Sequence, residues 1–362
     1  MLTNIQESFL HLVRLGTGTS IDTKISDEID WDALKALADK QGLTAIVLDG
    51  LNEALKLNSQ LSTLNTQLKL SWIGEVHQNY EQRYEKCRQT IGQLSRFYND
   101  HGFRLMVLKG YGLSLNYPKP NHRPCGDIDI WAFGQYKEAD AAISKEFSIP
   151  IEHDHHHHTV FKFKGFTVEN HYDFLNVHHH KSNKELEAIL KKLGQDDSHH
   201  VLLRGEKVYL PSANLHALFL LRHSMSNFAA AGMKLRQLLD WAFFVKAHST
   251  EIDWNWLEGV LETCGMKCLY DVFNAICVSD LGFDVSIFPQ VQFDPCLKDR
   301  VLNDILSPEF SEKEKGGFVS RAVYKYRRWR ANAWKHELCF KESMWSAFWS
   351  GIWSHLLKPA SI

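Results

Sequence analysis

The chain has 362 residues, of which 44% are hydrophobic and 23% charged, and its formal net charge is −2 at pH 7. This length is enough for a large core divided into two or three lobes, and the near-neutral charge argues against a globally basic nucleic-acid coat, although a local patch stays open. No apolar run reaches the ~18 residues that span a membrane, the N-terminus lacks a secretory pattern, and seven irregularly spaced cysteines favour reduced thiols in the cytoplasm.

Residues 1–100 are predicted to form an N-terminal helical segment. Apolar residues recur at helical spacing from Ser26 to Leu55, with Ser26 as a candidate N-cap and Gly42 as the break between two helices. From Leu61 to Asn99 they recur every three or four positions with almost no helix breakers. This pattern predicts a long helix that packs against the next domain.

Two short apolar runs, Leu105–Leu108 and Ile128–Phe133, are each of a length typical of a buried strand. Asp127 and Asp129 open the second run, and they point to the same face because strand side chains alternate. Two carboxylates on one face suit a hard cation such as Mg²⁺, whose ligands are oxygens. The alternative is a strand-opening turn in which aspartate caps loop amides.

A second pair of strands is predicted between residues 149 and 174, after a helix over Gln135–Phe147. The segment alternates on both sides of a possible turn at Lys164-Gly165. The last run places a polar row on one face, which is richer than an ordinary solvated strand edge; its members are Thr167, Glu169, His171 and Asp173.

The remainder of the chain is predicted to be mainly helical. A helix over Asn183–Leu193 and a strand near Lys207–Leu210 close the sheet region, and only helices follow Pro211. The expected helices cover 215–225, 234–248, 254–264, 269–278 and 318–357. We therefore divide the chain into an N-terminal helical segment 1–100, a core 101–210, a C-terminal helical lobe 211–310 and a basic-aromatic helical segment 311–362.

Two compositionally unusual segments admit more than one interpretation. The tract His153–His158 reads HDHHHH, and imidazoles suit transition metals, yet a solvated loop between strands with adventitious metal binding is the favoured interpretation. The basic-aromatic segment is compatible with RNA contact, with a membrane-surface helix, or with an amphipathic helix packed on the body of the protein.

The order strand, Lys-Gly, short helix, loop and Asp-x-Asp strand resembles the core of the DNA polymerase β-like nucleotidyltransferase superfamily. It is most similar to the bacterial family often labelled "uncharacterised nucleotidyltransferase", over about residues 100–245. The resemblance implies an α+β fold, with a small mixed sheet flanked by an N-terminal helical segment and a C-terminal all-helical lobe. The residues that carry it are Leu108-Lys109-Gly110, Tyr117, Arg123, Gly126-Asp127-Ile128-Asp129-Ile130, Val168-Glu169-Asn170-His171 and 235–240.

The resemblance also implies roles. Asp127, Asp129 and Glu169 would be the catalytic carboxylates and the ligands of two Mg²⁺ ions, which stabilise the attacking and leaving oxygens of nucleotidyl transfer. Asp173 is the reserve for Glu169. NTP binding would fall to Lys109, Gly110, Arg123 and His171, where His171 either bonds the acceptor or orients Glu169.

One departure from the superfamily concerns the turn that holds the triphosphate. The usual Gly-Ser or Gly-Gly is Gly110-Tyr111 in this chain, so Lys109, Gly112 or Ser114 would have to substitute. The predicted function is transfer of an NMP from an NTP to a hydroxyl or phosphate of a small metabolite, a sugar phosphate or an RNA end. The alternative is a catalytically silent module that binds nucleotide or a partner. The oligomeric state stays open.

Overall fold

The computed structural model describes residues 2–22, 29–57, 66–178, 180–230, 232–290, 292–310, 318–343 and 345. The chain forms two compact units. The helical unit contains Met1–His77, Leu221–Ser249 and Trp254–Lys341, and the sheet unit contains Gln78–Leu220, Thr250–Asp253 and Glu342–Ile362. The helical unit thus joins three stretches that are far apart in the sequence.

The helical unit begins with helices whose ends follow from local capping chemistry. Thr3 forms a capping box with Gln6 at the start of α1 (Asn4–Thr17). Asp30 caps α2 (Trp31–Gln41), and the left-handed Gly42 ends it, which confirms the predicted break. The predicted cap Ser26 lies outside the described residues. The following helices are α3 (Thr44–Leu57) and α4 (Thr66–Val76).

Helices α1 and α3 are in close contact at two glycines. A β-carbon built on Gly16 would lie 1.9 Å from the Ile46 carbonyl oxygen, and one on Gly50 would lie 1.9 Å from the Leu12 carbonyl oxygen. No larger residue fits at either position, because backbone rather than a movable side chain stands in the way.

The rest of the helical unit agrees broadly with the predicted periodicity. The predicted helix 318–357 divides at Asn332 and ends at Cys339, before the extended residue Phe340, so its predicted length is wrong; residue 344 and the residues after 345 lie outside the described part. A further helix, α13, was not predicted. The elements are α9 (Ala213–Ala230, whose first part belongs to the sheet unit), α10 (Leu235–His248), α11 (Trp254–Thr263), α12 (Lys267–Ser279), α13 (Pro295–Leu306), α14 (Phe318–Ala331) and α15 (Ala333–Cys339).

The sheet unit holds one mixed sheet in the order β3-β4-β2-β1-β6-β5. β2 pairs parallel with β4, and β1 pairs antiparallel with β2 and parallel with β6. The fold is therefore α+β, as predicted. The strands are β1 (Met106–Val107), β2 (Ile128–Trp131), β3 (His158–Phe163), β4 (Phe166–His171), β5 (His200–Leu203) and β6 (Glu206–Tyr209). The helices of this unit are α5 (Arg83–Asp100), α6 (Tyr111–Ser114), α7 (Tyr136–Phe147) and α8 (Lys181–Leu193).

Two hairpins build the outer strands. Lys164 and Gly165 both have positive φ and turn β3 into β4, which confirms the predicted turn. Arg204 and Gly205 do the same between β5 and β6. β5 was not predicted, because its His-Val-Leu-Leu sequence has no alternation and only its last residue is buried.

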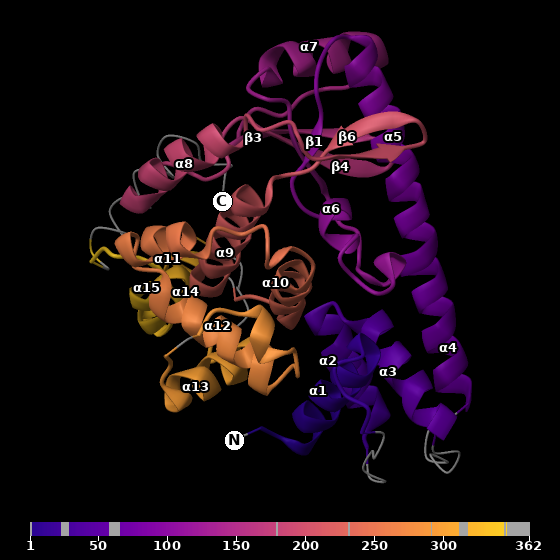
Figure 1. Ribbon diagram of the computed structural model, residues 1–362, viewed down its shortest axis with the longest axis vertical. Helices are drawn as coiled ribbons and strands as arrows, with labels where there is room; N and C mark the ends of the chain where they lie inside the picture. Colours follow the sequence, from indigo (N-terminus) through magenta and orange to yellow (C-terminus); the bar gives the residue numbers. More distant parts are fainter. Residues whose placement is uncertain are drawn as a thin grey trace. The chain divides into compact units, whose positions relative to one another are not determined.

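Helices α5 and α7 cover one face of the sheet with an apolar core (Figure 1). Ile128, Ile130 and Val168 point into this core, so alternation directs Asp129 and Glu169 to the opposite face. The predicted long helix is largely confirmed: α4 continues through a π-helical segment, His77–Gln82, into α5, whose buried stripe faces the sheet.

Two further observations concern disulfide bonds and membrane-spanning helices. None of the seven cysteines forms a disulfide. Within the described ranges, no helix has both the length and the apolar character that crossing a bilayer requires.

Candidate functional site

Strand register brings two of the three predicted carboxylates together. In the parallel pairing of β2 with β4, Asp129 is the partner of Glu169 and Trp131 is the partner of His171. Paired residues on neighbouring strands present their side chains to the same face. Asp129, Glu169 and His171 each offer a ligand atom, and the three atoms lie within 4.8 Å of one another.

Asp129 is the electrostatic centre of this group. It is 7% exposed, and its Oδ1 lies 2.6 Å from Lys109 Nζ and 3.3 Å from His171 Nε2. Burial alone would raise the pKa of the carboxyl. The Lys109 ammonium and the His171 ring outweigh that effect and hold the pKa of Asp129 well below its ordinary range. Asp129 is therefore ionised at any working pH.

The surroundings of Glu169 shift its pKa in the opposite direction. Burial, and then the neighbouring charge of Asp129, raise the pKa of Glu169 above its ordinary value, although Lys109 and His171 partly offset them. His171 Nε2 lies 3.8 Å from Glu169 Oε2, and its Nδ1 lies 3.2 Å from the Asp173 carbonyl oxygen. A carbonyl oxygen can only accept, so Nδ1 carries a proton. His171 thus directs Nε2 towards both carboxylates.

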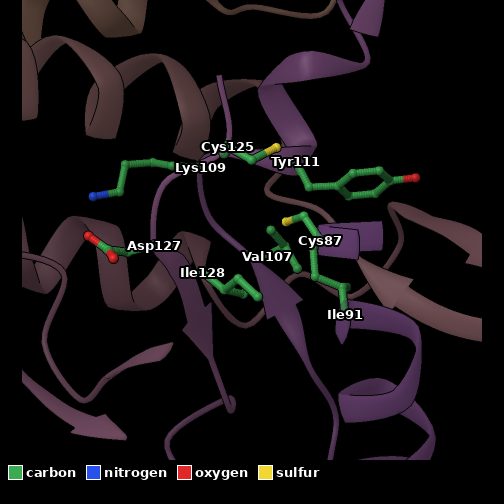
Figure 2. Close-up of a pocket in the computed structure, with 9 residues that line it drawn as sticks. Cys87, Ile91, Val107, Lys109, Tyr111, Cys125, Asp127 and Ile128 are labelled. Carbon is green, nitrogen blue, oxygen red and sulfur yellow. The ribbon is translucent and has the colours of Figure 1, made fainter. Parts of the chain in front are cut away.

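Asp127 and Gly110 lie at the exposed rim of the site. Asp127 is exposed, and in Figure 2 its carboxylate and the Lys109 ammonium extend to the same side of the backbone. Gly110 has φ 54° and ψ −105°, a conformation that only glycine adopts readily, and it starts the short helix α6. The Lys-Gly step therefore turns the chain so that Lys109 reaches Asp129.

Tyr111, the unusual residue of the turn, points the other way (Figure 2). It is 6% exposed, and its ring centroid lies 6.0 Å from that of Tyr84 on α5. It belongs to the pocket of Figure 2, which is also lined by Cys87 and Cys125. The Tyr111 side chain therefore packs in the core and does not lie next to the Lys109 ammonium.

Two other residues of the prediction, Arg123 and Asp173, have contacts outside the carboxylate group. Arg123 is 5% exposed, its Nη1 donates to the Pro124 carbonyl oxygen at 3.2 Å, and its charge acts on the Cys87 thiol. Asp173, the reserve carboxylate, forms an ion pair with Lys191 on α8. Asp173 does not belong to the group of ligand atoms around Asp129.

The histidine tract departs from its predicted solvated loop. His156 and His158 are 4% and 7% exposed, and His158 begins β3 as the cross-strand partner of His171. The prediction of a solvated loop is therefore wrong for these two residues, because pairing with β4 draws the end of the tract into the sheet. Burial, and then His171, lower the pKa of His158 to about 3.

One comparison with known proteins shows the family of the chain. A family model described as "Uncharacterised nucleotidyltransferase" matches residues 27–279. The chain belongs to this family. The match includes every strand of the sheet and all the predicted site residues, so the predicted resemblance is confirmed and extends beyond residues 100–245 on both sides.

Curated proteins and solved structures add little to the family match. No curated protein matches the chain. Among solved structures, an antigenic nucleotidyltransferase-like protein from Paracoccidioides brasiliensis is similar over 56% of this chain and 97% of its own, with 13% identity and a TM-score of 0.36.

Proposed function

We propose that the chain is a metal-dependent nucleotidyltransferase that moves an NMP from an NTP to an acceptor hydroxyl or phosphate. The observation that carries this proposal is the convergence of Asp129, Glu169 and His171 on one face of the sheet, with ligand atoms within 4.8 Å of one another. The family match supports the same class of reaction.

The donor set fits a divalent cation. Asp129 and Glu169 offer carboxylate oxygens at neighbouring positions of parallel strands, and exposed Asp127 stands two residues before Asp129 on the same face. In our proposal Asp127, Asp129 and Glu169 hold Mg²⁺. When bound, such ions supply charge stabilisation for the attacking and leaving oxygens.

Lys109 has two roles in this proposal. Without nucleotide its ammonium neutralises buried Asp129 at 2.6 Å. When a triphosphate arrives with its cations, Lys109 is free to turn to the phosphate oxygens, because the cations then neutralise the carboxylate. The flexible stem of lysine suits such a movement. Gly110 supports this movement because it adds no side chain to the turn beside Lys109, which leaves room for the phosphate oxygens.

Glu169 is the residue that prepares the acceptor. Its carboxylate lies beside Asp129 and His171, where one oxygen can bind the cation while the other accepts the proton of the acceptor. In the reaction the acceptor oxygen bonds to the α-phosphorus, the bond to pyrophosphate breaks, and the acceptor proton passes to Glu169. His171 orients Glu169 through Nε2 at 3.8 Å, while its own ring is fixed through Nδ1.

A second candidate is a catalytically silent module that binds nucleotide or a partner. The Lys109–Asp129 ion pair favours it, since an ammonium already satisfies the central carboxylate. The two candidates differ in one respect: only the enzyme releases pyrophosphate.

The test is pyrophosphate release with Mg²⁺, each of the four NTPs and an acceptor pool from a cell extract. We expect release by the wild type and loss in an Asp127→Ala, Asp129→Ala double variant. Asp100→Ala, at an exposed position at the end of α5, is the control that should keep activity. Equal release by the wild type and the double variant would refute the enzymatic function.

The acceptor class can be separated by salt. An RNA end would be bound with an affinity that falls steeply as salt rises, because phosphate contacts release counterions. A small metabolite or sugar phosphate would show little salt dependence in a binding titration.

A further inference from the structure

Three histidine rings gather beside the carboxylates, on β3 and β4. His158 and His171 are cross-strand partners, and their ring centroids lie 5.2 Å apart. His157 directly precedes β3, with its ring centroid 4.4 Å from that of His158 and 5.5 Å from that of His171. One ligand nitrogen from each ring lies within 4.8 Å of the other two. Three converging imidazoles match the protein ligand set of an open zinc site.

The backbone holds these rings in place. Directly opposed residues of an antiparallel pair point to the same face, so His158 and His171 face each other by register alone. The carbonyl oxygen of His157 accepts hydrogen bonds from the backbone N–H groups of Tyr172 and Asp173, at 3.0 and 3.1 Å. These bonds extend the ladder by one residue and fix His157 beside the pair. The cluster is therefore formed before any ion arrives.

The surroundings of His158 and His171 indicate how their ring nitrogens could bind a metal. His158 is 7% exposed, and its Nδ1 has no hydrogen-bond partner among the described residues. A buried polar atom in that situation is disfavoured unless something else satisfies it. His171 donates Nδ1–H to the Asp173 carbonyl oxygen, and its Nε2 lies 3.3 Å from Asp129 Oδ1, so a bound ion would take the place of the proton between Nε2 and that carboxylate. Metal-binding histidines are commonly oriented in this way by a carbonyl oxygen on the second nitrogen.

We propose that His157, His158 and His171 form a site for one borderline divalent ion of the Zn²⁺ class. Imidazole nitrogens suit Zn²⁺, whereas Mg²⁺ prefers oxygen ligands, so this site and the carboxylate site differ in the ion that they select. His171 belongs to both groups of ligand atoms, so the two sites compete for it. The inference goes beyond the proposed function, and its test requires neither nucleotide nor turnover.

The test is metal binding to the full chain, purified without a polyhistidine tag and stripped with a chelator. Zn²⁺ is titrated by calorimetry, and Co²⁺ is followed through the visible absorption of its bound form. We expect one Zn²⁺ per chain in a site that His157→Asn and His158→Asn each weaken at least about tenfold, since even outer-shell changes cost 10–100-fold. His153→Asn, at an exposed position of the same tract, should change the affinity less than about twofold.

The design separates this site from its competitors. If Zn²⁺ sits instead on Asp129, Glu169 and His171, Glu169→Gln will weaken it and His158→Asn will not, which would overturn the proposal. Equal loss in His153→Asn and His158→Asn would mean adventitious binding by the tract and would also overturn it. Circular dichroism checks the fold of each variant. Should His158→Asn fail to fold, half-buried His157 provides the decisive variant.

Discussion

The ion pair between Lys109 and Asp129 makes a sharp prediction about stability. Lys109→Met keeps the length and apolar volume of the stem but removes the ammonium that lies 2.6 Å from Asp129 Oδ1. The side chains of the pair are 16% and 9% exposed, so water screens the interaction poorly. The variant therefore leaves a buried carboxylate with one cationic neighbour fewer.

The size of the effect follows from this geometry. At 2.6 Å and an effective dielectric constant of about 20, the attraction is about 6 kcal/mol, most of which offsets the cost of burying the charges. Removing one partner of a buried pair costs about 3–5 kcal/mol. We expect the lower end, about 3 kcal/mol, because His171 Nε2 remains 3.3 Å from the same oxygen. For a domain of 150–250 residues this lowers Tm by about 6–12 °C.

A divalent cation should recover much of this loss in the variant. An ion that binds only the folded chain stabilises it by about 2.7 kcal/mol at one hundred times its Kd. Lys109→Met should bind Mg²⁺ more tightly than the wild type, since no ammonium has to leave Asp129. The assay is thermal unfolding by circular dichroism, with EDTA or with MgCl₂. Lys86→Met, at an exposed position on α5, is the control.

Two outcomes would refute this reasoning. The first is a Tm of Lys109→Met in EDTA equal to that of the Lys86→Met control, which would mean that the pair contributes nothing. The second is an equal gain in Tm from MgCl₂ in the wild type and in Lys109→Met, which would mean that the cation does not compete with Lys109 for the carboxylate.

Three further predictions concern the same unit. Gly110→Ala should lower the free energy of unfolding in urea by about 1–3 kcal/mol, because φ at this position is 54°. Gly126→Ala is the control and should change it by no more than about 0.5 kcal/mol, since a β-carbon there meets nothing within 4 Å. Equal effects of the two substitutions would contradict the strain assigned to Gly110. Glu169→Gln should lower pyrophosphate release by about 10²–10⁴-fold with unchanged Tm, and unchanged release would remove its role as base. Burial raises the pKa of Glu187 to about 7, from 4.5 in the unfolded chain, so its stabilising contribution is complete below pH 4.5 and is lost as pH rises through 7. Between pH 4.5 and 8 the free energy of unfolding of the wild type should therefore fall by up to about 3 kcal/mol relative to that of Glu187→Gln. Urea unfolding across this pH range measures both, and an equal change in the two proteins would contradict this prediction.

Local patterns were sufficient for several features of the molecule. Alternation placed Asp127 and Asp129 on one face and the neighbouring isoleucines in the core, because the period of a strand is fixed by its backbone. Gly42 and the Lys164-Gly165 turn were predictable because each depends on the backbone preference of one or two residues. The family resemblance rested on these same short stretches, and the family match confirms it.

Other features depend on contacts between residues far apart in the chain. The pairing of Asp129 with Glu169 follows from the register of β2 against β4, which no local pattern specifies. The role of Arg123 at the phosphates stays a prediction. Strand β5 was missed because its pairing with β6, rather than its own composition, makes it a strand.

The sequence by itself determined the α+β class, the family and the two carboxylates that stand two residues apart. Each of these follows from short stretches of sequence that can be recognised without knowledge of the tertiary structure. Only the tertiary structure decided that Lys109 neutralises Asp129 and that His158 faces His171. The physical reason is that burial and ionic pairing depend on which strands lie side by side. Strand order is fixed by the packing of the whole sheet against α5 and α7, not by any one segment.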